Sequence, residues 1–190
     1  PTILSLETQN SVLSPQIKEV VANLNTFFVE DLRSARRFIS SLKVGKVIDE
    51  ITFYELNKDT PPETTLKQLK SLKTDAGIIS EAGCPGVADP GQALISVAQE
   101  MNITIKPLVG PNSILLALMA SGMNGQQFQF TGYLPIDQQQ RIKAIKELEI
   151  TAAKNNSTQI FIETPYRNNQ LLEVLMTTCR PYTKLCIAVD

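Results

Sequence analysis

The sequence predicts an α/β protein with a mostly parallel sheet. Short apolar runs alternate with amphipathic helical patterns along the 190 residues, as in strand–helix–strand units. A loop rich in Gly and Pro, residues 80–91, follows the apolar run at 76–79, and open α/β sheets bind ligands in loops at the carboxyl ends of strands. Gly110-Pro111 interrupts the alternation, so we expect one α/β domain over 1–110 and another over 111–190.

Composition limits the possible functions. The chain has 18 Lys and Arg against 19 Asp and Glu, and this net charge of -1 predicts no general attraction to nucleic acid. No apolar run approaches the ~20 residues of a membrane span, and the start lacks the basic flank of a signal peptide. The absence of histidine excludes Ser-His and Cys-His catalytic pairs, and the three cysteines lack metal-ligand spacing. We therefore expect a cytoplasmic protein without a metal site.

The elements of the first domain follow from apolar periodicity. Apolar runs predict strands at residues 26–29, 76–79 and 103–109. Helical spacing predicts helices at residues 15–25, 32–42, 61–72 and 92–101. Ser14-Pro15 is a typical helix start, and Thr60-Pro61-Pro62-Glu63 has the pattern of a capping box.

The second domain continues the same alternation. Strands are predicted at residues 127–130, 159–162 and 185–189, and helices at residues 114–121, 138–148 and 168–178. Gly132-Tyr133-Leu134-Pro135 predicts a loop, and residues 163–167 predict a strand-to-helix corner. The last strand stops abruptly at Asp190, so we expect this domain to be incomplete.

Two groups of charged residues have two interpretations each. Arg33, Arg36 and Arg37 lie on one face of a helix, either as a solvated, salt-bridged surface or as a contact for an anionic substrate. Glu163 and Arg167 are four residues apart, either as an ion pair that fixes the corner or as groups at the mouth of a cleft.

Two further side chains belong to the candidate loops. Tyr166 could stack on a base or sugar, although a partly buried Tyr is commoner. Cys84 lies near a helix start, but no base is evident beside it. We therefore interpret it as a small side chain that lines a ligand pocket rather than as a nucleophile.

Four groups of motifs stand in order along the chain. They are Glu30-Asp31-Leu32-Arg33 with Arg36-Arg37, residues 80–91, Gly110-Pro111-Asn112-Ser113, and Gly132-Tyr133-Leu134-Pro135 with residues 163–167. In this order they resemble the tetrapyrrole methylase superfamily of S-adenosylmethionine-dependent enzymes. Within it the chain is most similar to the ribosomal RNA small-subunit methyltransferase I branch, over about residues 13–190.

The resemblance implies two α/β domains with a cofactor cleft between them, a homodimer, and ribosomal RNA as substrate. Methyl transfer to a cytidine ribose 2′-hydroxyl is the branch's reaction. By position, the residues that would hold S-adenosylmethionine are Gly83, Cys84, Pro85, Val87, Ser113 and Ile114. Those that would hold the substrate are Arg33, Arg36, Arg37, Tyr166 and Arg167.

A ribose hydroxyl is a poor nucleophile, so a base or an activating hydrogen bond is expected. Glu81 is the first candidate and Glu163 the second. Two alternatives stay open: methylation of a tetrapyrrole or other small molecule, and a non-catalytic binding paralogue. The second alternative is motivated by departures from the branch pattern, such as Glu81 in place of Asp and Cys84 in place of Thr.

Overall fold

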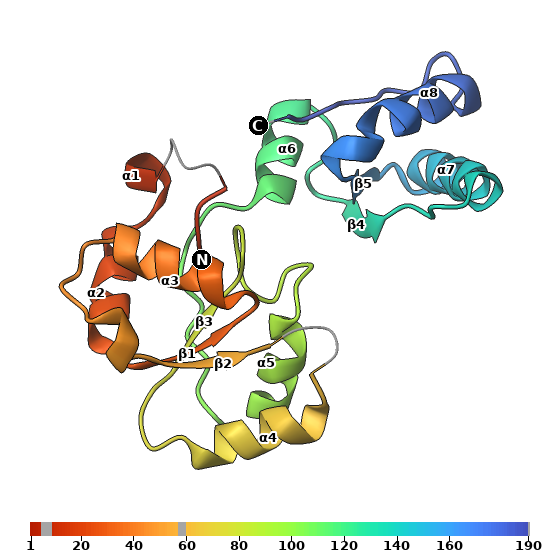
Figure 1. The fold of residues 1–190 in the computed structure, drawn as a ribbon. Helices are drawn as coiled ribbons and strands as arrows, with labels where there is room; N and C mark the ends of the chain where they lie inside the picture. Colours follow the sequence, from red (N-terminus) through yellow and green to blue (C-terminus); the bar gives the residue numbers. More distant parts are fainter. Residues whose placement is uncertain (5–8, 57–59, 190) are drawn as a thin grey trace. The chain divides into compact units, whose positions relative to one another are not determined.

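The computed structural model describes residues 1–4, 9–56 and 60–189. Contacts divide the chain into two compact units, Pro1–Ser113 and Ile114–Asp190. Both units combine helices with parallel strands (Figure 1), which confirms the mixed α/β class with parallel sheets. The domain boundary predicted at residue 110 lies three residues before the division between the units.

The first unit is built on a three-stranded parallel sheet. Its strands are β1 (Thr26–Val29), β2 (Thr52–Glu55) and β3 (Gly77–Ile79), in the order β2-β1-β3. Phe28 in β1 pairs with Tyr54 on one side and Ile78 on the other. Because β1 is central, the chain leaves it toward one edge of the sheet and returns to the other, which makes the gap between β1 and β3 the topological switch point.

Helices cover both faces of this sheet (Figure 1). The helical elements are α1 (Gln9–Val12), α2 (Pro15–Asn23), α3 (Leu32–Ser41), the 3-10 turn η2 (Ile48–Glu50), α4 (Pro62–Ser71) and α5 (Gly91–Glu100). Alternation along β1 explains the two layers, because successive side chains of a strand point to opposite faces. Phe27 and Val29 pack with α2 and α3, whereas Phe28 packs with α4 and α5.

The second unit has a two-stranded parallel sheet. Its elements are α6 (Ser113–Ser121), β4 (Phe128–Tyr133), α7 (Gln138–Asn155), β5 (Thr158–Ile162), the 3-10 turn η3 (Pro165–Arg167) and α8 (Asn168–Thr178). β4 pairs with β5. Ile145 of α7 and Leu171 and Leu175 of α8 meet the buried Leu134 in its core.

Polar caps explain where several helices begin. Asp31 accepts a hydrogen bond from the Ser34 backbone N–H at 2.6 Å, and Asp137 accepts one from Gln140 at 2.9 Å. Each bond satisfies a backbone donor that has no partner inside the first turn. Asn156, in the left-handed region with φ 47°, ends α7.

Several predicted elements were wrong. No strand forms at residues 103–109 or 185–189 in the described chain, because a strand also needs a neighbour whose backbone is free to pair. β2 was not predicted, and it forms because β1 offers it such a neighbour. The capping box does not form, since Pro61, which has no side-chain acceptor, occupies the N-cap of α4. Gly132 and Tyr133, predicted as loop, belong to β4.

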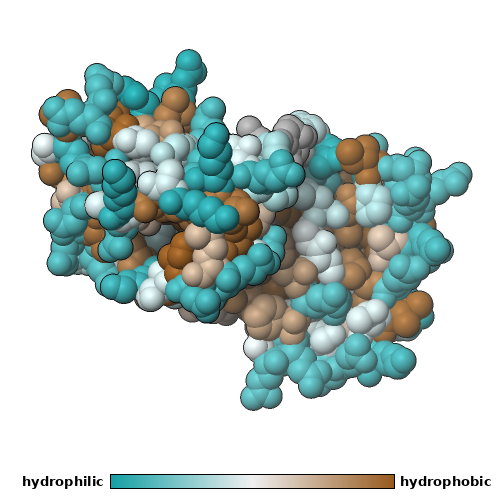
Figure 2. Space-filling model, turned by 90° about the horizontal axis from the view of Figure 1, so that it is seen from below, coloured by the Kyte–Doolittle hydropathy of each residue, from teal (hydrophilic) through white to brown (hydrophobic). Residues whose placement is uncertain are grey.

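The surface mixes polar and apolar side chains. On the face drawn in Figure 2, hydrophobic residues form patches between hydrophilic ones. Within the described residues, no helix combines the length and the apolar character needed to cross a bilayer. In the same part of the chain, no group of three or more His, Cys, Asp or Glu side chains is arranged to hold a metal ion.

Candidate functional site

The carboxyl ends of β1 and β3 bring two segments of the first unit together. Glu30 follows β1 directly, and Ser80 and Glu81 follow β3. The Glu30 backbone N–H donates to the Ile79 carbonyl at 3.3 Å, which extends the pairing of these strands past their ends. Parallel strands direct the segments after them to the same edge of the sheet, so these residues converge at the switch point.

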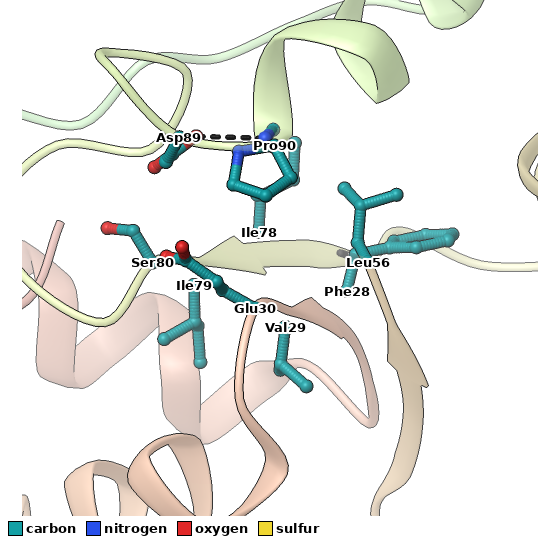
Figure 3. A pocket seen from close by; sticks show the side chains of 10 residues that line it. Phe28, Val29, Glu30, Leu56, Ile78, Ile79, Ser80, Asp89 and Pro90 are labelled. Carbon is teal, nitrogen blue, oxygen red and sulfur yellow. Dashed lines mark hydrogen bonds between the residues drawn. The ribbon is translucent and has the colours of Figure 1, made fainter. Parts of the chain in front are cut away.

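A small cavity lies at this edge (Figure 3). Glu30, Ser80 and Asp89 provide its polar side chains, and apolar residues of β1 and β3 line it together with Leu56, which follows β2. Its volume of about 10 Å³ is room for about one water molecule. A nucleotide-sized ligand therefore does not fit inside the cavity itself and would have to lie on the surrounding loop.

The loop after β3 is closed by one carboxylate. Asp89 Oδ1 accepts hydrogen bonds from the backbone N–H groups of Gly86 at 2.6 Å and Gly91 at 2.8 Å. Asp89 Oδ2 is buried and has no hydrogen-bond partner in the described chain. Ala88 has φ 62°, a conformation that costs free energy for a residue with a Cβ, and such strain is concentrated at functional sites.

Gly83 is required by its backbone conformation. Its φ is +68°, and a Cβ there would lie 3.3 Å from both Leu4 Cδ2 and the Pro111 carbonyl oxygen. The Gly83 carbonyl accepts a 2.8 Å hydrogen bond from the Thr2 backbone N–H, and the Thr2 side chain donates to the Ser80 carbonyl at 3.2 Å. The loop is thus held between the first residues of the chain and residues 110–111.

Three of the other residues predicted to hold a cofactor, Cys84, Pro85 and Val87, lie on this loop. The Cys84 thiol donates to the Pro111 carbonyl at 3.3 Å, so Cys84 fastens the loop to the following segment. Pro85 is half-buried, and Val87 is exposed beside it. Ser113 begins α6 and closes the first unit, whereas Ile114 is the first residue of the second.

Carboxylates dominate the electrostatics of the edge. Glu81 is exposed, its Oε1 accepts from the Ser34 hydroxyl at 3.2 Å, and its backbone N–H donates to Glu30 Oε2 at 3.2 Å. Desolvation raises the pKa of Glu30, and the charges of Asp89, Glu81 and Asp31 add to this effect. The edge therefore favours a cationic or proton-donating ligand.

The three arginines of α3 do not share one environment. Arg36 is ion-paired with Asp49, as the solvated-surface interpretation predicts. Arg33 and Arg37, one turn apart, are exposed. Two of the three are therefore available to an anionic substrate.

Glu163, Tyr166 and Arg167 come together in the second unit, after β5. Arg167 Nη2 lies 2.6 Å from Glu163 Oε1, and the two side chains are 17% and 4% exposed. The same Glu163 oxygen also accepts from the Thr164 backbone N–H at 2.8 Å. Glu163 Oε2 is buried without a hydrogen-bond partner in the described chain. The geometry favours the interpretation of this corner as an ion pair, since the Glu163 carboxylate is bound to Arg167.

Tyr166 is 84% exposed, which differs from the commoner, partly buried tyrosine. The Arg167 guanidinium carbon lies 5.7 Å from the centre of its ring, a cation–π distance.

Sequence reasoning did not assign a binding or catalytic role to Glu30, Ser80, Asp89 or Arg141. A polar residue directly after a predicted strand is a signal that could have found Glu30 and Ser80. Asp89 could not be found in this way, because its hydrogen bonds to Gly86 and Gly91, which close the loop, are evident only in the structure. Arg141, one of the most buried side chains of the molecule, carries no such signal, because its burial depends on the packing of α7 against the loop before it.

No protein-family model matches the chain. A protein named ribosomal RNA small subunit methyltransferase I from Halalkalibacterium halodurans is 31% identical over 163 residues, which are 82% of this chain and 54% of that protein. The protein of the same name from Micromonospora olivasterospora is 32% identical over 149 residues, 78% of this chain and 45% of that protein. The one from Synechocystis is 26% identical over 176 residues, 93% of this chain and 61% of that protein.

The chain thus spans about half the length of the curated relatives that it matches. The similarity extends through both units and includes the loop after β3. The chain is a relative of the proteins named ribosomal RNA small subunit methyltransferase I, which confirms the resemblance that its motifs predicted.

Proposed function

We propose that this protein is an S-adenosylmethionine-dependent methyltransferase that methylates a ribose 2′-hydroxyl of small-subunit ribosomal RNA. The observation that carries the proposal is the similarity to proteins of that name over most of the chain. The position of the Gly-rich loop at the switch point of a parallel sheet supports it. The homodimer and the cofactor cleft between the two domains are parts of the proposal that depend on the resemblance alone.

The residues at the edge of the first unit fit this cofactor. S-adenosylmethionine carries a sulfonium and an ammonium cation, and the carboxylates of Glu30, Glu81 and Asp89 make the edge negative. Gly83 and Gly86 have positive φ, so the loop has a backbone conformation that a residue with a Cβ would adopt only under strain. When bound, the cofactor supplies the electrophilic methyl group.

We assign Gly83, Cys84, Pro85 and Val87 to cofactor contacts in the first unit, and Ser113 with Ile114 to contacts at the start of α6. Their part is to orient the ligand rather than to react with it. Holding two reactants in the correct geometry can supply about 7–11 kcal/mol of the barrier reduction. Cys84 is engaged with the Pro111 carbonyl, so its thiol serves the loop conformation.

The acceptor hydroxyl has to lose a proton during transfer. Glu81 is the better candidate for this role, because it is exposed and its carboxylate is held by the Ser34 hydroxyl. Glu163 is the weaker one, since its accessible hydrogen-bonding capacity is used by Arg167 and Thr164. We assign Arg33 and Arg37 to the RNA phosphates, with Arg36 supporting the helix surface through Asp49.

Calorimetric titration with S-adenosylmethionine tests the cofactor, and labelled methyl transfer to small ribosomal subunits that lack the modification tests the reaction. Saturable binding and label at one ribose are expected. No binding up to millimolar concentration contradicts the enzyme proposal. Binding without transfer to RNA favours the small-molecule alternative, for which the near-neutral net charge is the supporting observation.

A further inference from the structure

We propose that Tyr133 and Tyr166 form a stacking platform for unpaired bases of single-stranded RNA at the carboxyl end of the β4–β5 sheet. The substrate class depends on the proposed function. The platform itself depends on the two exposed rings, on the contact of Arg167 with the Tyr166 ring, and on the buried Arg141 that holds the backbone after Tyr133.

Both tyrosines lie at the same edge of one sheet. Tyr133 is the last residue of β4 and is in register with Ile162, the last residue of β5, and Tyr166 follows Ile162 by four residues. Their exposed fractions are 57% and 84%. Neither ring therefore contributes much to the core, although each is placed on a rigid element rather than on a long loop.

A bulge in β4 determines where Tyr133 lies. Phe130 pairs with Ile160 and Tyr133 with Ile162, so three steps along β4 match two along β5. Gly132 provides the extra residue with φ +72°, and the Thr131 hydroxyl fastens the bulge to the Ile160 carbonyl at 3.1 Å. Bulges commonly redirect a side chain beside a functional site. Without this bulge, the strict alternation of the strand would place Tyr133 on the other face.

A buried charge supports the segment that follows Tyr133. The Arg141 guanidinium donates to the carbonyls of Pro135 at 2.8 Å and Ile136 at 2.6 Å, and to Gln170 of α8 at 3.4 Å. Arg141 is 1% exposed, and no carboxylate of the described chain forms an ion pair with it. These three hydrogen bonds compensate for the burial of the charge, and they stabilise one conformation of the loop.

A second buried group supports Tyr166. Glu163 holds Arg167, the Thr164 hydroxyl accepts from Arg167 Nε at 3.2 Å, and the guanidinium lies against the Tyr166 ring. The ring is thereby kept in place on one side while most of its surface stays open to solvent. A preorganised, exposed aromatic ring is what a stacking contact needs, because little side-chain entropy is lost on binding.

The chemistry of the platform favours a base over an anionic or peptide ligand. The positive charge of Arg167 is balanced by Glu163, so the edge offers ring surface rather than net charge. Every nucleobase has a face that can stack on such a ring, whatever its sequence. RNA-binding proteins hold splayed, unpaired bases in this way.

The test uses the whole chain and a single-stranded cytidine oligonucleotide of RNA. The chain has no Trp and four Tyr, so tyrosine emission reports stacking directly, and anisotropy of labelled RNA gives the affinity. Tyr133→Ala and Tyr166→Ala should each weaken binding about 5- to 150-fold. Their slopes of log affinity against log salt should be unchanged, because no phosphate contact is lost. Tyr133→Phe and Tyr166→Phe should bind like the wild type.

Tyr182→Ala is the matched control, since Tyr182 is 77% exposed and lies outside the platform. Equal RNA affinity of the wild type and both Ala variants overturns the platform, as does an absence of RNA binding by the wild type. Loss of affinity in the Phe variants as large as in the Ala variants also overturns it, because the hydroxyl groups would then be the contact. Titration of the wild type with S-adenosylmethionine is a separate measurement. If the wild type binds the cofactor but the Ala variants bind RNA as well as the wild type does, only the platform is contradicted. If the wild type does not bind the cofactor, only the proposed function is contradicted.

Discussion

The Glu81 backbone N–H donates to Oε2 of Glu30 at 3.2 Å, across 51 positions of the sequence. This bond joins the ends of β1 and β3, and it places the carboxyl group of Glu30 beside the backbone of Glu81. Because Glu30 is desolvated and faces neighbouring carboxylates, its pKa is raised.

Replacement of Glu30 by Gln should increase stability at neutral pH. A raised carboxyl pKa means that the native state binds the proton more tightly, so stability falls as pH rises from the ordinary value of 4.5 through the raised value. Gln keeps the acceptor for the Glu81 N–H and removes the charge. Thermal melts at pH 7 should therefore show a higher melting temperature for Glu30→Gln. The difference should disappear well below pH 4.5, and Glu19→Gln, at an exposed position of α2, should match the wild type. A variant less stable than the wild type at pH 7 would show that the charge of Glu30 is stabilising.

Gly83→Val should abolish binding of S-adenosylmethionine while the chain stays folded. Valine at φ +68° is strained, and its Cβ would press on Leu4 and the Pro111 carbonyl, which would shift the loop that we assign to the cofactor. Gly125→Val is the control, because a Cβ there meets nothing within 4 Å and φ is not positive. Calorimetry and thermal melts on the same samples give both quantities. Near-wild-type affinity of folded Gly83→Val would place the cofactor elsewhere.

Arg33→Ala combined with Arg37→Ala should weaken RNA binding and flatten its salt dependence. Each lost phosphate contact reduces the slope of log affinity against log salt by about 0.7 for a single strand. Arg36→Ala should have a smaller effect, since Arg36 is already paired with Asp49. The measurement is anisotropy of labelled RNA at several salt concentrations. An unchanged slope in the double variant would exclude α3 from the RNA contact.

Arg141→Met should destabilise the second unit by about 2–4 kcal/mol, because the Pro135 and Ile136 carbonyls lose their buried donors. Lys143→Met on the same helix is the control: its side chain is 80% exposed, and its 3.9 Å pair with Glu147 contributes little. Urea unfolding gives the free energies, and hydrogen exchange locates the change, which should be largest at residues 131–137. Equal stability of both variants would mean that the loop does not depend on Arg141.

Arg167→Met should cost about 3–5 kcal/mol, because it leaves the carboxylate of Glu163 buried without its counter-ion. The double variant Glu163→Gln with Arg167→Met removes that charge and should recover much of the loss. Urea unfolding of the wild type, both single variants and the double variant completes the thermodynamic cycle. Additive effects of the two changes would indicate that the pair does not stabilise the corner.

The sequence by itself determined the local elements whose signals lie within a few residues. The apolar run at 26–29 coincides with β1, Ser14-Pro15 begins α2, and Asp31 caps α3 as an acid at a helix start should. The order of its motifs also determined the family resemblance, since that depends on residue identity and spacing alone. Periodicity and caps act within one or two turns of chain, so they can be read without the fold.

Only the tertiary structure decided which elements pair and which polar groups meet. The runs at 103–109 and 185–189 were predicted as strands, as β3 was, but they form no strand in the described chain, because a strand requires a partner distant in sequence. The contacts of Glu30 with Glu81, of Arg141 with Gln170 and of Arg36 with Asp49 likewise join residues that lie on different elements of the chain. Such contacts are fixed by packing in three dimensions, and no local pattern in the sequence specifies them.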